Sequence, residues 1–156
     1  MSTIHLIRHA KAKNRVEWSE PDEVRPLTKR GRREALALAE RLADEHLGRL
    51  VSSPYLRCVQ TLEPLAVAVD LPVETTDELA EGASGESVAA LLLSLAAERP
   101  LACCTHGDVV YDVLRFVADE GVLLDGPRDS PVASTWILAA ESGRFAGARY
   151  VEPPPR

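Results

Sequence analysis

The chain has no run of about 18 apolar residues, the length that a helix needs to span a bilayer. Met1-Ser2-Thr3 leads straight into a strand-like run, with no basic region followed by an apolar signal segment. We therefore expect a cytoplasmic protein with no membrane contact. A length of 156 residues suits one domain with a sizeable core and is too short for two full domains.

Cysteine is scarce. Cys58, Cys103 and Cys104 form an odd set without C-x-x-C spacing, which does not indicate a disulfide framework. We expect small thiols that line the core, because free cysteine is among the most buried residue types. A redox-active or nucleophilic cysteine is the alternative.

Positive charge is also in short supply. The net charge of −6 argues against general nucleic-acid binding. The exception is residues 1–33, where nine Lys or Arg residues stand against four acids, a balance of +5 that leaves −11 for the remainder. This distribution suits a small anionic ligand held at one place. A solvated helix face would account for the basic residues at 29–33, but less well for Lys11, Lys13 and Arg15.

Two nucleotide-binding motifs are missing. Neither G-x-x-x-x-G-K-[ST] nor G-x-G-x-x-G is present, so the sequence does not support a P-loop or a dinucleotide site. His5 and His9 would form a metal pair on a helix, but in a strand four residues cover about 13 Å. We therefore expect no metal and no cofactor, with His5 and His46 as structural or surface residues.

Apolar runs alternate with segments of helical periodicity. The expected strands cover residues 3–8, 47–52, 72–75 and 101–105, with a closing antiparallel pair at 132–139 and 144–151. The expected helices cover 28–46, 53 to about 69 with a kink or break at Pro64, 88–98 and 108–118. The expected N-caps are Thr28, Ser53 ahead of Pro54, and either Ser84 or Ser87.

This alternation predicts a three-layer α/β/α sandwich with a mostly parallel central sheet and an antiparallel C-terminal edge. We expect a single domain over residues 1–152 and a flexible proline-rich tail over 153–156. In such sheets ligands bind beyond the carboxyl ends of the strands. Arg8-His9, Ser53-Pro54 and Thr105-His106 all follow expected strand ends, so the topology should bring them to one rim.

These residues have the chemistry for phosphoryl transfer. A neutral imidazole at His9 can attack phosphorus, and the guanidinium groups of Arg8 and Arg57 can bind phosphate oxygens bidentately. His106 can donate to the same oxygens, and the helix that opens after Gly107 adds an anion-favouring dipole. Taken singly, each side chain would more often be structural or solvated, so the interpretation depends on all of them meeting.

A leaving alkoxide also needs a proton. Glu81 lies on a loop that should face the rim, and we expect it to be the general acid, with Glu78 and Asp108 as the other candidates. Alone, a loop glutamate would usually be solvated.

Four segments together resemble the motifs of the histidine phosphatase superfamily, also called phosphoglycerate-mutase-like. They are Leu6-Ile7-Arg8-His9, Leu27-Thr28-Lys29-Arg30-Gly31, the run Ser52 to Thr61 with Arg57, and Cys104-Thr105-His106-Gly107. The resemblance implies a metal-independent phosphatase that works through a phosphohistidine intermediate. Mutase activity is disfavoured because the chain lacks the helical insertion of the longer mutases.

The substrate class stays open between two branches. The run Val24 to Thr28 resembles the short bacterial phosphohistidine phosphatases, which often lack a carboxylate where Glu81 stands. The run Arg8 to Ala12, the downstream Trp18 and the run Gln60 to Leu65 resemble the phosphatase domain fused to some actinobacterial Nudix hydrolases. We expect a small phosphorylated metabolite or nucleotide as the substrate, with phosphohistidine on a protein as the alternative and a non-catalytic phospho-ligand-binding domain as a second alternative.

Lys11, Lys13, Arg15 and Trp18 could clamp extra phosphates and stack a base, although Trp18 could equally pack its loop. A monomer or a homodimer fits this sequence.

Overall fold

The half of the sheet that carries the site consists of four parallel strands. In the computed structural model, which describes residues 1–155, they lie in the order β3-β2-β4-β1. β1 pairs with β4 from Ile4 opposite Leu101 to Arg8 opposite Thr105, so both strands end at the same level. The strands are β1 (Ser2–Arg8), β2 (Arg49–Ser52), β3 (Val73–Thr75) and β4 (Leu101–Thr105).

The other half of the sheet is largely antiparallel. β6 (Thr135–Glu141) runs antiparallel to β1, and β7 (Arg144–Val151) returns beside it. Ser142 and Gly143 both have positive φ angles in the turn between them. β5 (Leu124–Asp125) adds two residues beside β7. This last strand was not predicted, because two residues are too few to show a period.

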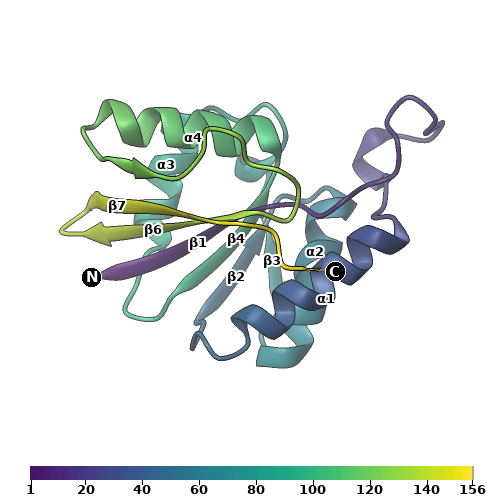
Figure 1. Cartoon of the computed structure of the whole chain (residues 1–156), viewed down its shortest axis with the longest axis horizontal. Helices are drawn as coiled ribbons and strands as arrows, with labels where there is room; N and C mark the ends of the chain where they lie inside the picture. The colour runs from purple at the N-terminus through teal and green to yellow at the C-terminus, as the bar shows by residue number, and fades with distance from the viewer. Residues whose placement is uncertain (156) are drawn as a thin grey trace.

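Two helices cover each face of the sheet (Figure 1). α1 and α2 pack on one face, and α3 and α4 pack on the other. β1 shows why, since Ile4 and Leu6 join the core under α3 and α4 while Ile7 joins the core under α1 and α2. The helices are α1 (Lys29–Leu42), α2 (Leu56–Val69), α3 (Gly85–Leu95) and α4 (Gly107–Asp119), with short 3-10 turns η1 (Asp22–Val24) and η2 (Asp77–Leu79). The predicted three-layer architecture is confirmed.

The helix ends differ from the prediction in places. Thr28 and Ser84 cap α1 and α3 as expected, accepting from Gly31 N and Ser87 N. α1 ends at Leu42 instead of residue 46, because the chain then turns and His46 has a φ of 57°. α3 begins at Gly85, three residues before the predicted start.

The predicted start of α2 is wrong. The helix begins at Leu56 with Tyr55 as N-cap residue, so Ser53 and Pro54 lie outside it. The Ser53 oxygen accepts from the Tyr55 amide at 3.3 Å and also lies 2.8 Å from His106 Nε2, so it bonds ahead of the helix and not within its first turn. Once begun, α2 continues through Pro64 without a break.

Residues 152–155 form neither strand nor helix. Pro154 is nevertheless buried, and Arg41 donates to the Glu152 carbonyl at 2.7 Å, which places this segment beside α1 (Figure 1). Arg156, the last residue of the predicted tail, lies outside the described residues. Within residues 1–155 the structure contains no helix long and apolar enough to cross a membrane.

Candidate active site

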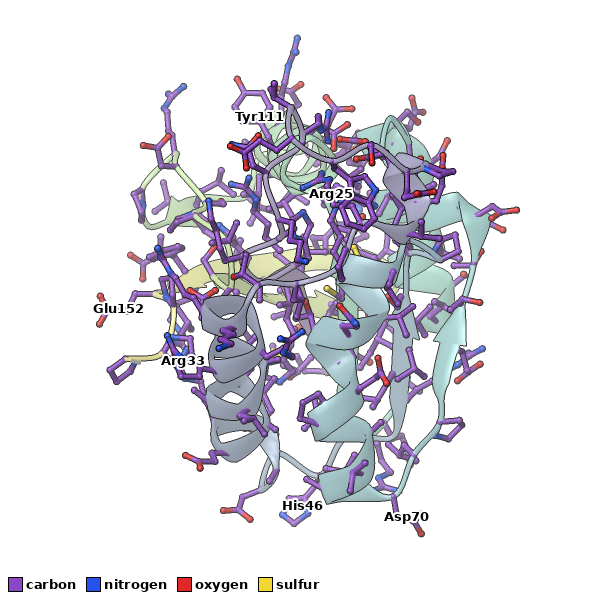
Figure 2. The ribbon with its side chains drawn as sticks, turned by 90° about the vertical axis from the view of Figure 1, so that its right-hand side faces the viewer. Arg25, Arg33, His46, Asp70, Tyr111 and Glu152 are labelled. Atoms are coloured by element: carbon purple, nitrogen blue, oxygen red, sulfur yellow. The ribbon has the colours of Figure 1, made fainter. Side chains whose placement is uncertain are left out.

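The three predicted segments meet at the carboxyl ends of β1, β2 and β4. The His9 amide donates to the Thr105 carbonyl at 3.1 Å, and the Ser53 amide donates to the Cys104 carbonyl at 3.0 Å, so backbone bonds tie each segment to the next strand. Between them opens a cavity of about 420 Å³. Its lining includes Arg8, His9, His106, Gly107, Glu81 and Asp108, together with residues 11–15 and Arg25. Figure 2 shows Arg25 at this end of the molecule and His46 at the opposite end.

His9 has the form a nucleophile needs. Its Nδ1 lies 2.8 Å from the Ala10 carbonyl oxygen, which can only accept, so Nδ1 carries the proton and Nε2 keeps its lone pair. Burial lowers the pKa of His9 to about 3, and the charges of Arg57 and Arg8 act in the same direction, against the hydrogen bond to Ala10. The ring is therefore neutral at physiological pH.

Arg8 ends β1 and packs against the first turn of α4. One terminal nitrogen donates to the Ser130 carbonyl at 2.8 Å. A Cβ at Gly107 would come within 2.8 Å of the Arg8 Cζ, so this close approach requires a glycine. Burial lowers the pKa of Arg8, and the nearby Asp108 carboxylate opposes that shift.

Arg57 is fully buried in the first turn of α2. Its terminal nitrogens donate to the Asp22 carbonyl at 2.9 Å and to the Asp22 carboxylate at 3.0 Å. Its Nε, like that of Arg8, is buried and has no hydrogen-bond partner among the described residues. Buried donors of this kind are rarely left unpaired, and an anion in the cavity would supply the missing acceptors.

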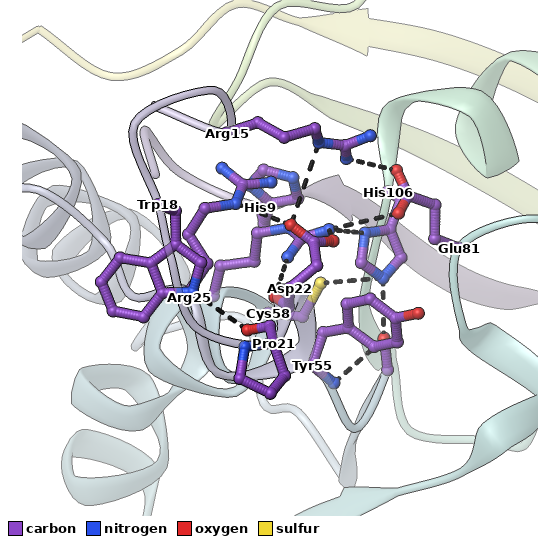
Figure 3. Close-up of polar contacts among 12 residues, drawn as sticks. His9, Arg15, Trp18, Pro21, Asp22, Arg25, Tyr55, Cys58, Glu81 and His106 are labelled. Carbon is purple, nitrogen blue, oxygen red and sulfur yellow. Dashed lines mark hydrogen bonds and ion pairs between the residues drawn. The ribbon is translucent and has the colours of Figure 1, made fainter. Parts of the chain in front are cut away.

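His106 faces the nucleophile from the end of β4. The two imidazole rings stand edge to face with centroids 5.6 Å apart. The His106 Nδ1 lies 3.4 Å from a terminal nitrogen of Arg57, and its Nε2 lies 2.8 Å from the Ser53 hydroxyl (Figure 3). Tyr55 closes the side of the ring at a centroid distance of 4.8 Å.

Two of the three predicted carboxylates reach the cavity. Glu81 accepts from Arg15 at 2.6 Å and lies 3.5 Å from Arg57. Asp108 also lines the cavity and accepts from the Gly82 amide at 2.9 Å. Glu78 is exposed on η2 and is absent from the described lining.

The four predicted substrate-binding residues of the loop between β1 and α1 do not all lie at the cavity. Lys11, Lys13 and Arg15 line the cavity. Trp18 does not belong to the described lining, and its indole donates to the Pro21 carbonyl at 3.0 Å. The Lys13 ammonium stands 5.9 Å from the Trp18 ring centre. Trp18 thus packs within the loop, which was the alternative left open by the sequence.

A chain of ion pairs beside the cavity was not predicted from the sequence. Asp22 binds both Arg57 and the buried Arg25, the latter at 2.8 Å. Burial alone would raise the pKa of Asp22, but hydrogen bonds from Arg25 and Arg57 outweigh it and lower the pKa. The opposite charges at positions 22 and 25 were a faint signal, since a polar loop gives no periodicity that marks a buried pair.

The remaining thiols and histidines have structural surroundings. All three cysteines are buried and form no disulfide within residues 1–155, and burial raises the pKa of Cys103 and Cys104. Cys58 differs, because its sulfur lies 3.6 Å from His106 Nε2; burial alone would raise its pKa, but hydrogen bonds with Cys104 and His106 lower it. His5 is 3% exposed in the core, and His46 is exposed on the surface. Among residues 1–155, no group of three or more His, Cys, Asp or Glu side chains could hold a metal ion.

Comparison with known proteins points the same way. The profile of the histidine phosphatase superfamily (branch 1) matches residues 4–90. The 8-oxo-(d)GTP phosphatase of Mycolicibacterium smegmatis is 31% identical over 157 residues, which cover 97% of this chain and 48% of that protein. The chain thus spans about half the length of this relative.

Two solved structures have the same fold. The protein histidine phosphatase SixA, complexed with tungstate, superposes with a TM-score of 0.78 at 24% identity, covering 97% of both chains. The mycobacterial glucosyl-3-phosphoglycerate phosphatase, complexed with VO3, has a TM-score of 0.71 at 18% identity, again covering 97% of both chains. With the family profile spanning more than half of its length, the chain belongs to branch 1 of the histidine phosphatase superfamily.

Proposed function

We propose that this protein is a metal-independent phosphatase that forms a phosphohistidine at His9. The observation that carries the proposal is the free lone pair on His9 Nε2, in a cavity that Arg8 and His106 also line. Arg57 is buried next to His106 and does not itself belong to the described lining; we call these four residues the phosphate cup. Family membership supports the same reaction.

In the first half of the reaction, His9 Nε2 attacks phosphorus and the bond from phosphorus to the leaving oxygen breaks. Glu81, protonated at that moment, gives its proton to the leaving oxygen. In the second half, water attacks the phosphorus, Glu81 takes the proton from that water, and the P–N bond breaks. Inorganic phosphate leaves, and His9 and Glu81 return to their starting states.

The cationic groups lower the barrier because they are in place before the charge develops. Arg8 lines the cavity and Arg57 is buried beside His106, and within residues 1–155 the Nε of each has no hydrogen-bond partner and remains available as a donor. Removing one preorganised donor of this type typically costs about 3–4 kcal/mol of transition-state stabilisation.

For the substrate we propose a small phosphorylated metabolite or nucleotide. The 8-oxo-(d)GTP phosphatase that shares 31% identity with this chain acts on a nucleotide. Lys11, Lys13 and Arg15 line the same cavity as His9, and their charges suit contact with the second and third phosphates of a nucleotide. Glu81 at the cavity suits ester or anhydride substrates, whose leaving groups need a proton.

A protein phosphohistidine is the second candidate, and one contact favours it. Glu81 is tied to Arg15 at 2.6 Å, so the carboxylate must leave this ion pair before it can act as an acid. A phosphohistidine carries a good leaving group and can be hydrolysed without an acid. The relative rates on the two substrate classes decide between the candidates.

The experiment combines His9→Ala with a substrate panel of phosphohistidine protein, nucleoside di- and triphosphates and sugar phosphates. We expect wild type to form an acid-labile phosphoenzyme and His9→Ala to lose both labelling and turnover. His46→Asn, exposed at the opposite end of the molecule, is the matched control. Labelling of His9→Ala at the wild-type level would refute the proposal.

A further inference from the structure

The buried hydroxyl of Ser53 contacts His106 in a way that the proposed reaction has not yet used. Ser53 is fully buried just after β2, and its amide is held by the Cys104 carbonyl at 3.0 Å. Its Oγ lies 2.8 Å from His106 Nε2 and 3.3 Å from the Tyr55 amide, which donates to it. The N-cap role predicted for Ser53 involves only backbone amides and does not explain the contact with His106.

The other ring nitrogen determines the direction of this bond. Arg57 lies 3.4 Å from His106 Nδ1, and a guanidinium can only donate. Nδ1 therefore accepts, so the proton of the ring is on Nε2. Nε2–H must then donate to the Ser53 oxygen, and the hydroxyl acts as an acceptor.

When phosphate binds, the two ring nitrogens of His106 must exchange their donor and acceptor roles. Phosphate oxygens only accept, so His106 can bind one only by donating, and Nδ1 is the nitrogen on the Arg57 side of the ring. A neutral ring that carries its proton on Nδ1 needs a donor at Nε2. A hydroxyl can become that donor by rotating. The other neighbour of Nε2 is the Cys58 sulfur at 3.6 Å, a much weaker hydrogen-bonding group.

We propose that Ser53 is a positioning residue that lets His106 change tautomer when phosphate binds. Before phosphate binds, its oxygen accepts from Nε2–H. With phosphate bound its O–H donates to Nε2, while Nδ1–H donates to a phosphate oxygen. The ring releases one proton to water and takes up another, so its charge does not change. The inference rests on the proposed function, because it assumes that the cup binds a tetrahedral oxyanion.

The test titrates ¹⁵N-histidine-labelled protein with tungstate and follows the ring nitrogens of His106 by NMR. In wild type we expect tungstate to change Nδ1 from an acceptor signal to a protonated signal. In Ser53→Ala we expect about tenfold weaker tungstate binding and no such change. Ser52→Ala is the matched control, since it removes a neighbouring, equally buried hydroxyl whose bond is to the Ser53 carbonyl.

Kinetics supply a second readout. Ser53→Ala should lower kcat/KM roughly 10- to 100-fold, by analogy with the loss seen when the hydrogen-bond partner of a metal-binding histidine is removed. Ser53→Thr keeps the hydroxyl and should restore both the nitrogen signals and much of the rate, which a purely structural role of the serine side chain would not explain.

The possible failures are distinguishable. If Ser53→Ala binds tungstate like wild type and shows the same His106 signals, the inference is wrong even though the phosphatase is active. If wild type binds tungstate with the expected tautomer change but hydrolyses no substrate of the panel, the proposed function is wrong and the inference stands. If wild type binds no tungstate, both are overturned.

Discussion

Glu81 has two roles that compete for the same carboxylate. It is an ion-pair partner of Arg15 and Arg57, at 2.6 and 3.5 Å. As the proposed acid it must carry a proton and approach the leaving oxygen. A phosphate that takes over Arg57 removes one of these two cations from Glu81. Substrate binding therefore frees the Glu81 carboxylate from one of its two ion pairs.

Substitution of Glu81 by Gln should separate the two substrate types. Glu81→Gln should slow hydrolysis of alkyl phosphates by about 10²- to 10⁴-fold, because general-acid assistance is lost. Hydrolysis of p-nitrophenyl phosphate, whose leaving group needs no proton, should change far less. The measurement is kcat/KM for both substrates, with Asp108→Asn as the comparison at the same cavity. Equal losses on both substrates would contradict an acid role for Glu81.

At the scale of elements, the loop between β1 and α1 is fastened at its base. The Thr28 amide donates to the Lys11 carbonyl at 2.9 Å, and Ala12 pairs with Leu27 in an isolated bridge. Gly31 allows this closure, since a Cβ there would come within 2.0 Å of the Lys11 oxygen. The rest of the loop extends beyond the sheet (Figure 1), which carries its basic side chains to the cavity.

Charge reversal in this loop should show whether it binds additional phosphates. Lys11→Glu combined with Lys13→Glu should lower kcat/KM roughly tenfold or more for a nucleoside triphosphate, and less for a monoester. The effect should shrink with added salt, because the Debye length falls to about 3 Å at 1 M.

Arg32→Glu combined with Arg33→Glu is the control for this prediction. The double variant makes the same change in net charge at exposed positions of α1 outside the described cavity lining. Equal losses on triphosphate and monoester would count against the loop as a polyphosphate clamp.

At the scale of the whole molecule, stability and catalysis both involve buried neutral histidines. His5 has no hydrogen-bond partner for either ring nitrogen among the described residues. Burial lowers its pKa, Arg149 adds to the shift and Glu45 opposes it. The pKa of His9 is lowered in the same direction. In both cases the unfolded chain binds a proton more readily than the folded protein does.

The stability of the fold should therefore depend on pH with a definite sign. The contribution of His5 is fully present above the unfolded-state pKa of about 6.5 and is lost as the pH falls below it. His5→Leu should flatten this part of the curve, while the contribution of His9 remains. Urea unfolding between pH 5 and pH 8 measures the change, with His46→Asn as the exposed-histidine control. Parallel curves for wild type and His5→Leu would show that His5 does not titrate on unfolding.

Local patterns in the sequence determined the layers, the two helix caps at Thr28 and Ser84, and the convergence of Arg8, His9, Arg57 and His106. These follow from apolar periodicity, from capping chemistry one turn long, and from the rule that parallel strands end at one edge. Each of these signals is contained within a few neighbouring residues, or follows from topology alone.

The tertiary structure alone decided the partners of those residues. Asp22 meets Arg57 across 35 positions, and Ser53 meets His106 across 53. The same holds for Trp18, which packs in its loop, and for β5, which exists as a strand only because β7 lies beside it. Such contacts depend on how the packed elements orient individual side chains. No periodicity or spacing in the amino-acid sequence encodes that orientation.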